Sequence, residues 1–253
     1  MKNIPLVTIG LTTYNRPDLL KEAVRSVLNQ TFTDFVLIIG NDDPSSPVTF
    51  ETLEMPYDHR VEILNYSSNI GEISNMNNML ELAKTKWFTW LADDDIFHSQ
   101  YLELLIKTLQ NKSYSVSAVY CGYLAGDDLN ESFFHDVTNS KLISLTSHEF
   151  IPKYVSRKIN LQGNYGLLNT ENLKKIGGMP SLGNSFGPYS DTLIPILLSE
   201  TGCINYIDSP LCFLRTHMDS ESASSSNFEA FTTAEIDFLK RLIESCNNVG
   251  RNL

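Results

Sequence analysis

Residues 6–40 read LVTIGLTTYNRPDLLKEAVRSVLNQTFTDFVLIIG, and this stretch decides the fold class. Both of its ends, 6–12 and 35–40, are short apolar runs rich in β-branched residues, as buried strands are. Between them apolar side chains recur at helical spacing, and Pro17 suits the first turn of a helix. A strand, a helix and a second strand in this order predict a parallel pair joined by a right-handed crossover.

The alternation of strands and helices continues along the chain. We expect further strands at residues 61–64 and 87–91, and helices at 73–84 and 99–110. The sequence therefore predicts an α/β fold with an open, mostly parallel central sheet flanked by helices.

The chain after residue 111 mixes short strands and helices with polar segments. We divide the sequence into residues 1–111, residues 112–222, and a linker with a C-terminal helix in 223–253. Two separate strands are expected at 204–207 and 211–215.

Helix starts are marked by candidate capping residues. Ser99 and Ser147 are placed to cap helices, and Thr232 with Glu235 forms a capping-box pattern before the last helix. That helix carries an apolar stripe of Ile236, Leu239, Leu242, Ile243 and Cys246. We expect the stripe to dock on the body of the protein or on a second copy in a homodimer.

Composition narrows the class of partners. The formal net charge of −11 would repel nucleic acid and an anionic membrane over most of the surface. No stretch approaches the roughly 18 apolar residues of a membrane-spanning helix, and no export signal is visible. The four cysteines are scattered, which predicts buried thiols in a reducing compartment. We expect a cytoplasmic protein, and peripheral association with the inner face of a membrane stays open.

Three adjacent carboxylates, Asp93, Asp94 and Asp95, directly follow the expected strand 87–91. Ligands of open α/β sheets bind beyond the carboxyl ends of the strands. Because the three charges repel one another, a divalent cation is a natural partner, and it would also offset the charge of a diphosphate. The alternative is an acidic turn that caps the following helix.

Two further strand ends carry polar residues. Asp42 and Asp43 follow strand 35–40, where a carboxylate could accept a hydrogen bond from a uracil or thymine ring. An Asx turn explains the same residues. Thr12 and Tyr14 lie in the loop after the first strand, where they could bind and stack on a base. Neither a GxGxxG dinucleotide motif nor a P-loop motif is present.

These residues resemble a known family. The resemblance spans roughly residues 5–220 and is carried by segments in the family's order: TYNRP from residue 13, VRSVLNQT from 24, NDDPS from 41, NIG from 69, LELAK from 80, WFTWLADDDI from 87, KIGG from 175, SD from 190, YIDSP from 206 and LRTH from 214. The chain is thereby similar to the inverting glycosyltransferase family 2, which has the GT-A fold with a small acceptor-side subregion.

The resemblance implies roles for single residues. Thr12, Tyr14 and Asp43, with Asp42 as neighbour, match nucleoside-binding positions, and Asp93 matches a ribose or diphosphate contact. Asp94 matches the metal ligand, with Mn²⁺ or Mg²⁺ as the cofactor. Asp191 matches the catalytic base, and His217 sits where the family often contacts metal or diphosphate.

The implied reaction moves a sugar from a nucleotide diphosphate-sugar, with a UDP-sugar favoured, to a hydroxyl of a saccharide or glycoconjugate. Residues 1–111 would bind the donor, and 112–222 would bind the acceptor and supply the base. Bacterial surface polysaccharide synthesis is suggested by family analogy alone. The alternatives are an inactive sugar- or nucleotide-binding module, a sugar nucleotidyltransferase and a metal phosphohydrolase. The chain departs from the family at Ala92, where Asp is common, and at Ser190, where an acidic residue is usual.

Overall fold

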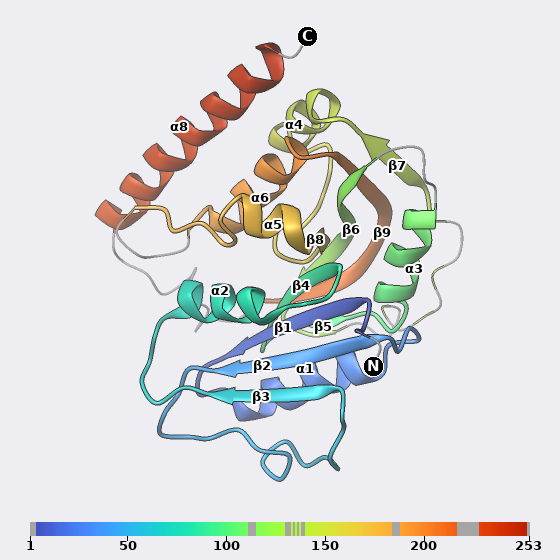
Figure 1. Cartoon of the computed structure of the whole chain (residues 1–253), viewed down its shortest axis with the longest axis vertical. Coiled ribbons are helices and arrows are strands. Elements are labelled where there is room, and N and C mark those ends of the chain that lie inside the picture. The colour runs from blue at the N-terminus through green and yellow to red at the C-terminus, as the bar shows by residue number, and fades with distance from the viewer. Residues whose placement is uncertain are drawn as a thin grey trace.

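The computed structural model describes residues 4–110, 115–129, 133, 135, 137, 140–183, 188–216 and 228–251. Within these residues one sheet of nine strands forms the centre of the molecule, flanked by helices (Figure 1). The strands are β1 (Val7–Thr13), β2 (Phe35–Asn41), β3 (Val61–Asn65), β4 (Trp87–Ala92), β5 (Ile96–Phe97), β6 (Val116–Gly126), β7 (Leu142–Leu145), β8 (Leu167–Asn169) and β9 (Cys203–Arg215). The helices are α1 (Pro17–Leu28), α2 (Glu72–Leu82), α3 (Tyr101–Lys107), α4 (Ser147–Val155), α5 (Thr170–Lys175), α6 (Ser190–Ser199) and α8 (Phe228–Arg251), with a 3₁₀ turn, η1, at Thr108–Gln110.

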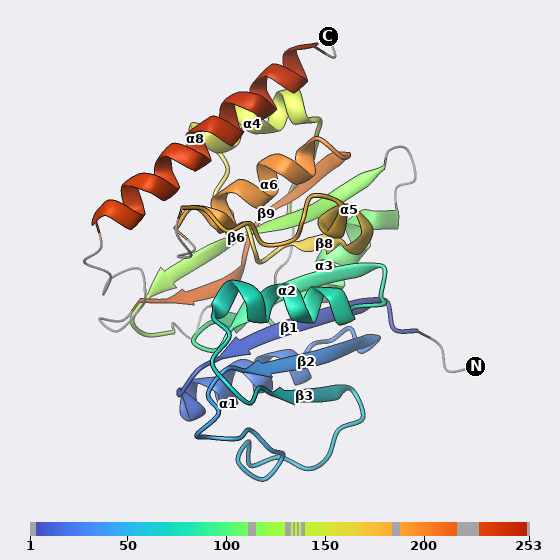
Figure 2. The same cartoon turned by 60° about the vertical axis from the view of Figure 1, so that its left-hand side comes forward.

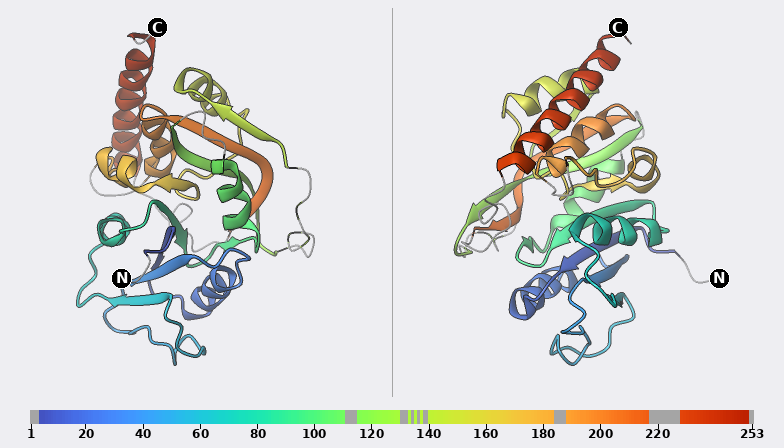
Figure 3. Two further views of the ribbon diagram at one scale, coloured as in Figure 1. Left: turned by 45° about the vertical axis from the view of Figure 1, so that its right-hand side comes forward. Right: turned by 90° about the vertical axis from the view of Figure 1, so that its left-hand side faces the viewer.

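The sheet order is β3-β2-β1-β4-β8-β6-β9-β5, with β7 paired to β9. The first four strands run parallel, and β8 joins β4 to β6 by antiparallel pairs. Figure 3 shows these two parts of the sheet, with the blue strands below and the green and orange strands above. The predicted α/β class with a large, mostly parallel sheet is confirmed. The division at residue 111 stays a prediction, since one sheet runs through both parts.

The two faces of the sheet bury separate apolar cores. Along β4, Trp87 and Leu91 point to the core that α1 and α3 cover, whereas Phe88 and Trp90 point to the opposite core. The second core is covered by α2, α4, α5 and α6. Because both faces are buried, β4 is a continuous apolar run rather than an alternating one.

Several helix starts and one strand break differ from the positions that the sequence predicted. Residue Gln100, not Ser99, precedes α3, and it makes no side-chain cap bond. Thr146, not Ser147, caps α4 in a capping box with Glu149. Helix α8 begins at Phe228, so Thr232 and Glu235 lie inside it. Residues 204–215 form one strand because shifts in register opposite β6 absorb the Asp208–Pro210 segment without ending the strand.

Helix α8 lies across α4 and α6, as Figure 2 shows. The predicted stripe is split between two faces. Leu242 packs against the second core, while Ile236, Leu239 and Ile243 are 48%, 46% and 60% exposed. Docking on the body is therefore present, and a homodimer through the outer face stays a prediction.

The thiols are not uniformly buried. Cys121 and Cys212 are buried, with their Sγ atoms 3.7 Å apart, but Cys203 is half-buried and Cys246 is exposed. The expectation of four buried thiols was wrong because Cys246 faces away from the body on α8. In the described residues, no helix is both long and apolar enough to cross a bilayer.

The two faces of α8 predict different costs of truncation. We expect Leu242→Ala to lower the free energy of unfolding by about 1–2 kcal/mol, since a half-buried leucine loses part of the cost of a full core truncation. Leu239→Ala, the matched control, should change it by less than about 0.5 kcal/mol. Urea titrations measure both values. Equal costs would contradict the observed docking face, and a Leu239 cost that appears only at high protein concentration would support the homodimer.

Candidate active site

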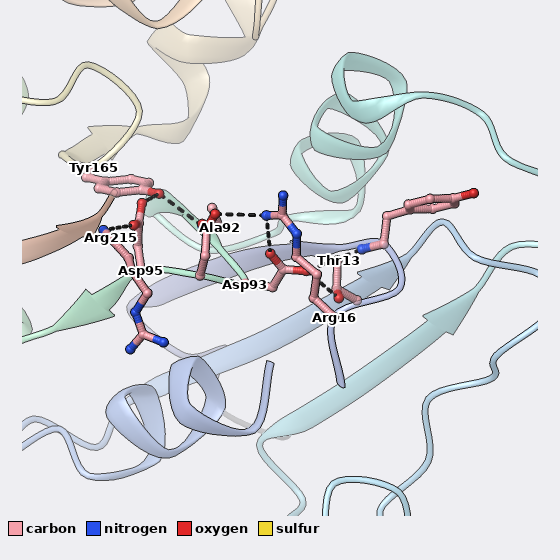
Figure 4. Close-up of polar contacts among 9 residues, drawn as sticks. Thr13, Arg16, Ala92, Asp93, Asp95, Tyr165 and Arg215 are labelled. Carbon is pink, nitrogen blue, oxygen red and sulfur yellow. Dashed lines mark hydrogen bonds and ion pairs between the residues drawn. The ribbon is translucent and has the colours of Figure 1, made fainter. Parts of the chain in front are cut away.

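The acidic motif meets the loop after β1 at one edge of the sheet. Strands β1 and β4 are adjacent and parallel, so Thr13 and Asp93 lie side by side at the ends of the two strands. The Thr13 hydroxyl donates to Asp93 Oδ2 at 2.7 Å, and the Tyr14 N–H donates to the same oxygen at 3.3 Å (Figure 4). Burial raises the pKa of Asp93, and the bond from Thr13 opposes that shift. Asp93 thus holds the loop that carries Tyr14, whose side chain is 53% exposed.

A guanidinium bridges the first two carboxylates of the motif. Arg16 Nη1 lies 2.8 Å from Asp94 Oδ2 and 3.4 Å from Asp93 Oδ1. The positive charge expected beside these acids is therefore supplied by the chain itself. The Asp94 side chain is 13% exposed and that of Asp93 is 6% exposed, so Asp94 is the more accessible of the pair.

The third carboxylate serves a different set of partners. The Tyr165 hydroxyl donates to Asp95 Oδ2 and accepts the Ala92 N–H at 3.2 Å. The Arg215 N–H donates to Asp95 Oδ1 at 2.8 Å. Burial, and then the neighbouring charge of Asp94, raise the pKa of Asp95 to about 7 against the effect of these two donors. Asp95 ties the end of β9 to the acidic motif.

The two acidic residues after β2, Asp42 and Asp43, make different contacts. Both oxygens of Asp42 accept backbone N–H groups, from Ile70 at 2.7 Å and from Gly71 at 2.8 Å, ahead of α2. Asp43 Oδ1 accepts both the N–H and the hydroxyl of Ser45, which lowers the Asp43 pKa. The Asx turn is therefore present. Asp43 Oδ2 has no hydrogen-bond partner among the described residues, so it remains available to a ligand.

Asp191 lies in the first turn of α6 and is oriented by two neighbours. Gln162 Nε2 donates to its Oδ2 at 2.6 Å, and the Thr192 N–H donates to its Oδ1 at 2.7 Å. Gly163 makes this approach sterically feasible, because a Cβ there would lie 1.7 Å from the Asp191 carbonyl oxygen. The predicted base is thus held in a fixed orientation.

One turn connects Asp191 with the acidic motif. The Tyr165 N–H donates to the Gln162 carbonyl at 3.1 Å, which closes a turn whose end Cα atoms are less than about 7 Å apart. Gln162 contacts Asp191 at one end of this turn, and Tyr165 contacts Asp95 at the other. The division predicted from the sequence puts Asp95 and Asp191 in separate parts of the chain. In the structure, this short turn connects the two carboxylates.

A pocket of about 670 Å³ opens beside Asp191. Aromatic and amide side chains contribute to its lining, including Tyr123, Tyr154, Tyr189, Asn160 and Gln162. Its size falls within the range of roughly 300–1,000 Å³ typical of ligand pockets. Aromatic rings and amides together suit a saccharide, which presents apolar faces and hydroxyl edges.

The described residues fit a divalent cation only together with a bound donor. No group of three His, Cys, Asp or Glu side chains in the described ranges is placed to hold a metal. His217 lies outside the described residues. Asp94 alone, or with Asp93, leaves most of the coordination shell to phosphate and water, a donor set that Mg²⁺ readily takes. The chain therefore suits a cation shared with a diphosphate rather than a cation held by protein alone.

The fold and this edge of the sheet define an α/β protein of the GT-A class. The sequence matches the profile of Glycosyl transferase family 2 over residues 8–164, more than half of the chain, and the chain belongs to that family. The match includes the acidic motif and ends at residue 164, one residue short of Tyr165 and well before Asp191.

The chain matches only part of the length of its curated relatives in this family. An uncharacterised glycosyltransferase of Rickettsia prowazekii (strain Madrid E) is 32% identical over 130 residues, which are 51% of this chain and 40% of that protein. The UDP-Glc:alpha-D-GlcNAc-diphosphoundecaprenol beta-1,3-glucosyltransferase WfgD of Escherichia coli is 29% identical over 118 residues, 47% of this chain and 46% of that protein. The matched region is thus less than half of either relative.

Solved structures show the same fold. TarS of S. aureus, residues 1–349, in complex with UDP-GlcNAc, has a TM-score of 0.66 and 14% identity, over 87% of this chain and 61% of that one. The mannosyltransferase PcManGT of Pyrobaculum calidifontis, in complex with GDP-Man and Mn2+, has a TM-score of 0.58 and 15% identity, over 96% and 65% of the two chains.

Arg16, Gln162 and Tyr165 were not predicted from the sequence as parts of the site, and Asp95 was given no role of its own within the acidic motif. Arg16 stands in a segment that carried the family resemblance, and the need for positive charge beside the acidic motif was the signal that could have found it. Gln162 and Tyr165 lie in a stretch without periodicity, so no local pattern marks them. Thr12, in contrast, is half-buried in β1 opposite Gly40 and Ala92, and its predicted nucleoside contact stays a prediction.

The raised pKa of Asp95 predicts a specific pH dependence of stability. Between the unfolded value of 3.8 and about 7, the folded protein keeps a proton that the unfolded chain releases. Stability from this group is therefore greatest at low pH and falls as the pH rises toward 7. In metal-free buffer, the stability of Asp95→Asn relative to wild type should increase by up to about 3 kcal/mol from pH 5 to pH 8. Urea titrations at both pH values measure this, and parallel curves for the two proteins would contradict the shift.

Proposed function

We propose that this chain is an inverting glycosyltransferase that moves a sugar from a UDP-sugar to a hydroxyl of a saccharide acceptor. The observation that carries the proposal is the turn from Gln162 to Tyr165, which contacts Asp191 at one end and the acidic motif at the other. A base beside an acceptor pocket and carboxylates at a donor edge are thus joined by one rigid element. A displacement reaction needs both partners in one fixed arrangement.

The donor side is built on the ends of β1, β2 and β4. Tyr14 is exposed for stacking on a base, and Asp43 Oδ2 is available to accept an imide N–H. Arg16, held by Asp93 and Asp94, lies where it can contact a diphosphate once the donor competes for it. The E. coli relative is named for a UDP-Glc donor, which supports uracil as the base.

The chemical step uses Asp191 as the general base. As the acceptor oxygen attacks the anomeric carbon, Asp191 takes the hydroxyl proton, and the carbon–oxygen bond to the nucleoside diphosphate breaks. Gln162 and Thr192 each hold one oxygen of the carboxylate, and Asp191 lines the pocket that would receive the acceptor. The sugar is transferred with inversion because the attack comes from the face opposite the leaving group.

Asp94 would hold the divalent cation, either Mn²⁺ or Mg²⁺, with His217 as a further predicted ligand. When bound, the cation supplies positive charge that neutralises the leaving diphosphate. Arg16 adds a second positive charge from the chain, and its contact with Asp94 must loosen for Asp94 to serve as a ligand. The E. coli relative is named for a GlcNAc-diphosphoundecaprenol acceptor, which supports a glycoconjugate as the product.

Donor binding is tested first. We expect UDP with Mn²⁺ or Mg²⁺ at about 100 times its dissociation constant to raise Tm by about 5 °C or more, and GDP to raise it less. Asp94→Asn should lose the metal-dependent part of this shift, because one hard oxygen ligand becomes an amide. Asp34→Asn, an exposed carboxylate change away from the site, is the control. A UDP shift that ignores both metal and Asp94 would refute the metal assignment.

The base is tested by kinetics. Asp191→Asn should reduce transfer by a factor of about 10²–10⁴ while leaving the UDP-dependent Tm shift intact. Gln162→Ala should lower kcat by about tenfold, since the carboxylate then keeps only its bonds from Thr192 and is less well oriented. Asp208→Asn, an exposed carboxylate on β9, serves as the control. Nucleoside diphosphate release with donor and acceptor gives the rate, and full activity of Asp191→Asn would rule out the base.

A further inference from the structure

The pocket beside Asp191 contains a second charged residue with no assigned role. Among the described residues that line it, Asp191 carries the negative charge and Arg157 carries the positive charge. The others are aromatic, aliphatic, amide, hydroxyl or glycine residues. The Arg157 guanidinium makes no hydrogen bond or ion pair with any residue that the structure describes. Arg157 is exposed, so its guanidinium is free to meet an anion that enters the pocket.

The backbone of Arg157 is strained. It ends α4 in a Schellman motif: its N–H donates to the Tyr154 carbonyl at 2.9 Å, and the Lys158 N–H donates to the Lys153 carbonyl at 2.9 Å. The residue at this position has φ 56°, a left-handed conformation in which glycine is favoured. Strained non-glycine residues cluster at ligand sites, because function retains a side chain that stability would discard.

The helix dipole does not by itself require Arg157. A cation near the end of α4 is favourable, but Lys153 already lies in its last turn. Lys158 follows directly, and it does not line the pocket. What Arg157 adds to these two lysines is a guanidinium at the pocket wall.

Helix α8 completes the pocket on another side. Phe238 lines it and stacks on Tyr189 with ring centroids 5.6 Å apart and an angle of 28° between the rings. Tyr189 directly precedes α6, whose first turn holds Asp191. The described lining therefore combines aromatic faces, one guanidinium and one carboxylate.

We propose that this pocket binds an anionic saccharide acceptor, whose negative group pairs with Arg157 while a sugar hydroxyl faces Asp191. This inference rests on the proposed transferase function and deepens it by naming the acceptor class. Asp191 repels an anion, so the two charges together orient the acceptor with its negative end toward Arg157. The negative group is a phosphate ester or the carboxylate of an acidic sugar, and both pair well with a guanidinium.

The test compares three acceptors with one alkyl chain: octyl glucoside, the octyl phosphodiester of glucose 1-phosphate, and octyl glucuronide. Transfer from the UDP-sugar that the enzyme turns over is measured, together with acceptor-induced Tm shifts in the presence of UDP. We expect at least one anionic acceptor to have a KM about tenfold below that of octyl glucoside, and this preference should shrink in high salt. The anion with the lower KM identifies its source as phosphate or carboxylate.

Variants at one position separate binding from structure. Arg157→Gln should erase the preference for the anionic acceptor without changing the KM of the UDP-sugar, and Arg157→Lys should retain part of it. Arg157→Gly should lose the preference while leaving Tm unchanged or higher, because glycine relieves the left-handed strain. Lys158→Gln, a neighbouring cation outside the pocket, should behave like wild type.

The outcomes distinguish the two levels of inference. Equal KM values for neutral and anionic acceptors, or a preference that survives in Arg157→Gln, would overturn the anionic site and leave the transferase intact. The same holds if the enzyme hydrolyses a UDP-sugar but neither transfers to nor is stabilised by any of the three probes. If no UDP-sugar is turned over with any metal or acceptor, the proposed transferase itself fails.

Discussion

Three successive carboxylates at the end of β4, two buried and one partly buried, are the constraint on which the site depends. Negative charges this close together repel one another and lose hydration. The chain must therefore supply a hydrogen-bond donor or a positive charge to each carboxylate. Asp93 is satisfied by Thr13 and by the loop after β1, and Asp94 by Arg16. Asp95 is satisfied by Tyr165 and the end of β9. Each compensation draws a distant segment to the same edge of the sheet, so electrostatics assembles the site.

The turn from Gln162 to Tyr165 connects the acidic motif with the acceptor side of the site. Its tyrosine satisfies Asp95, its glutamine orients Asp191, and Gly163 allows α6 to approach without a steric clash. The same turn also supports the sheet, because the Asn164 carbonyl accepts the Trp90 N–H at 3.3 Å. The distance between base and donor is therefore fixed by a segment with no regular secondary structure. Such a segment is suited to a site, because rigid strands and helices on both sides position it.

Helix α8 links substrate recognition to the packing of the C-terminal part. Its inner face covers α4 and α6, and Phe238 on that face also lines the pocket. The family profile matches residues 8–164, a range that does not include α8. The family match therefore covers the donor side and part of the pocket lining, whereas Tyr189, Asp191 and Phe238 lie beyond it.

The sequence by itself determined the parallel N-terminal strands, because apolar runs and helical spacing are local signals that burial on both faces of a sheet enforces. It also placed Asp93, Asp94 and Asp43 as candidates, since acidic residues after strands are visible in one dimension, whereas Asp191 became a candidate only through the family resemblance. Only the tertiary structure decided which carboxylates of the two acidic motifs are occupied by protein groups: Asp42 by the backbone N–H groups ahead of α2, and Asp95 by the Tyr165 hydroxyl. It alone brought Gln162 and Arg157 to the pocket, because their positions follow from contacts between segments far apart in the chain, which no local periodicity records.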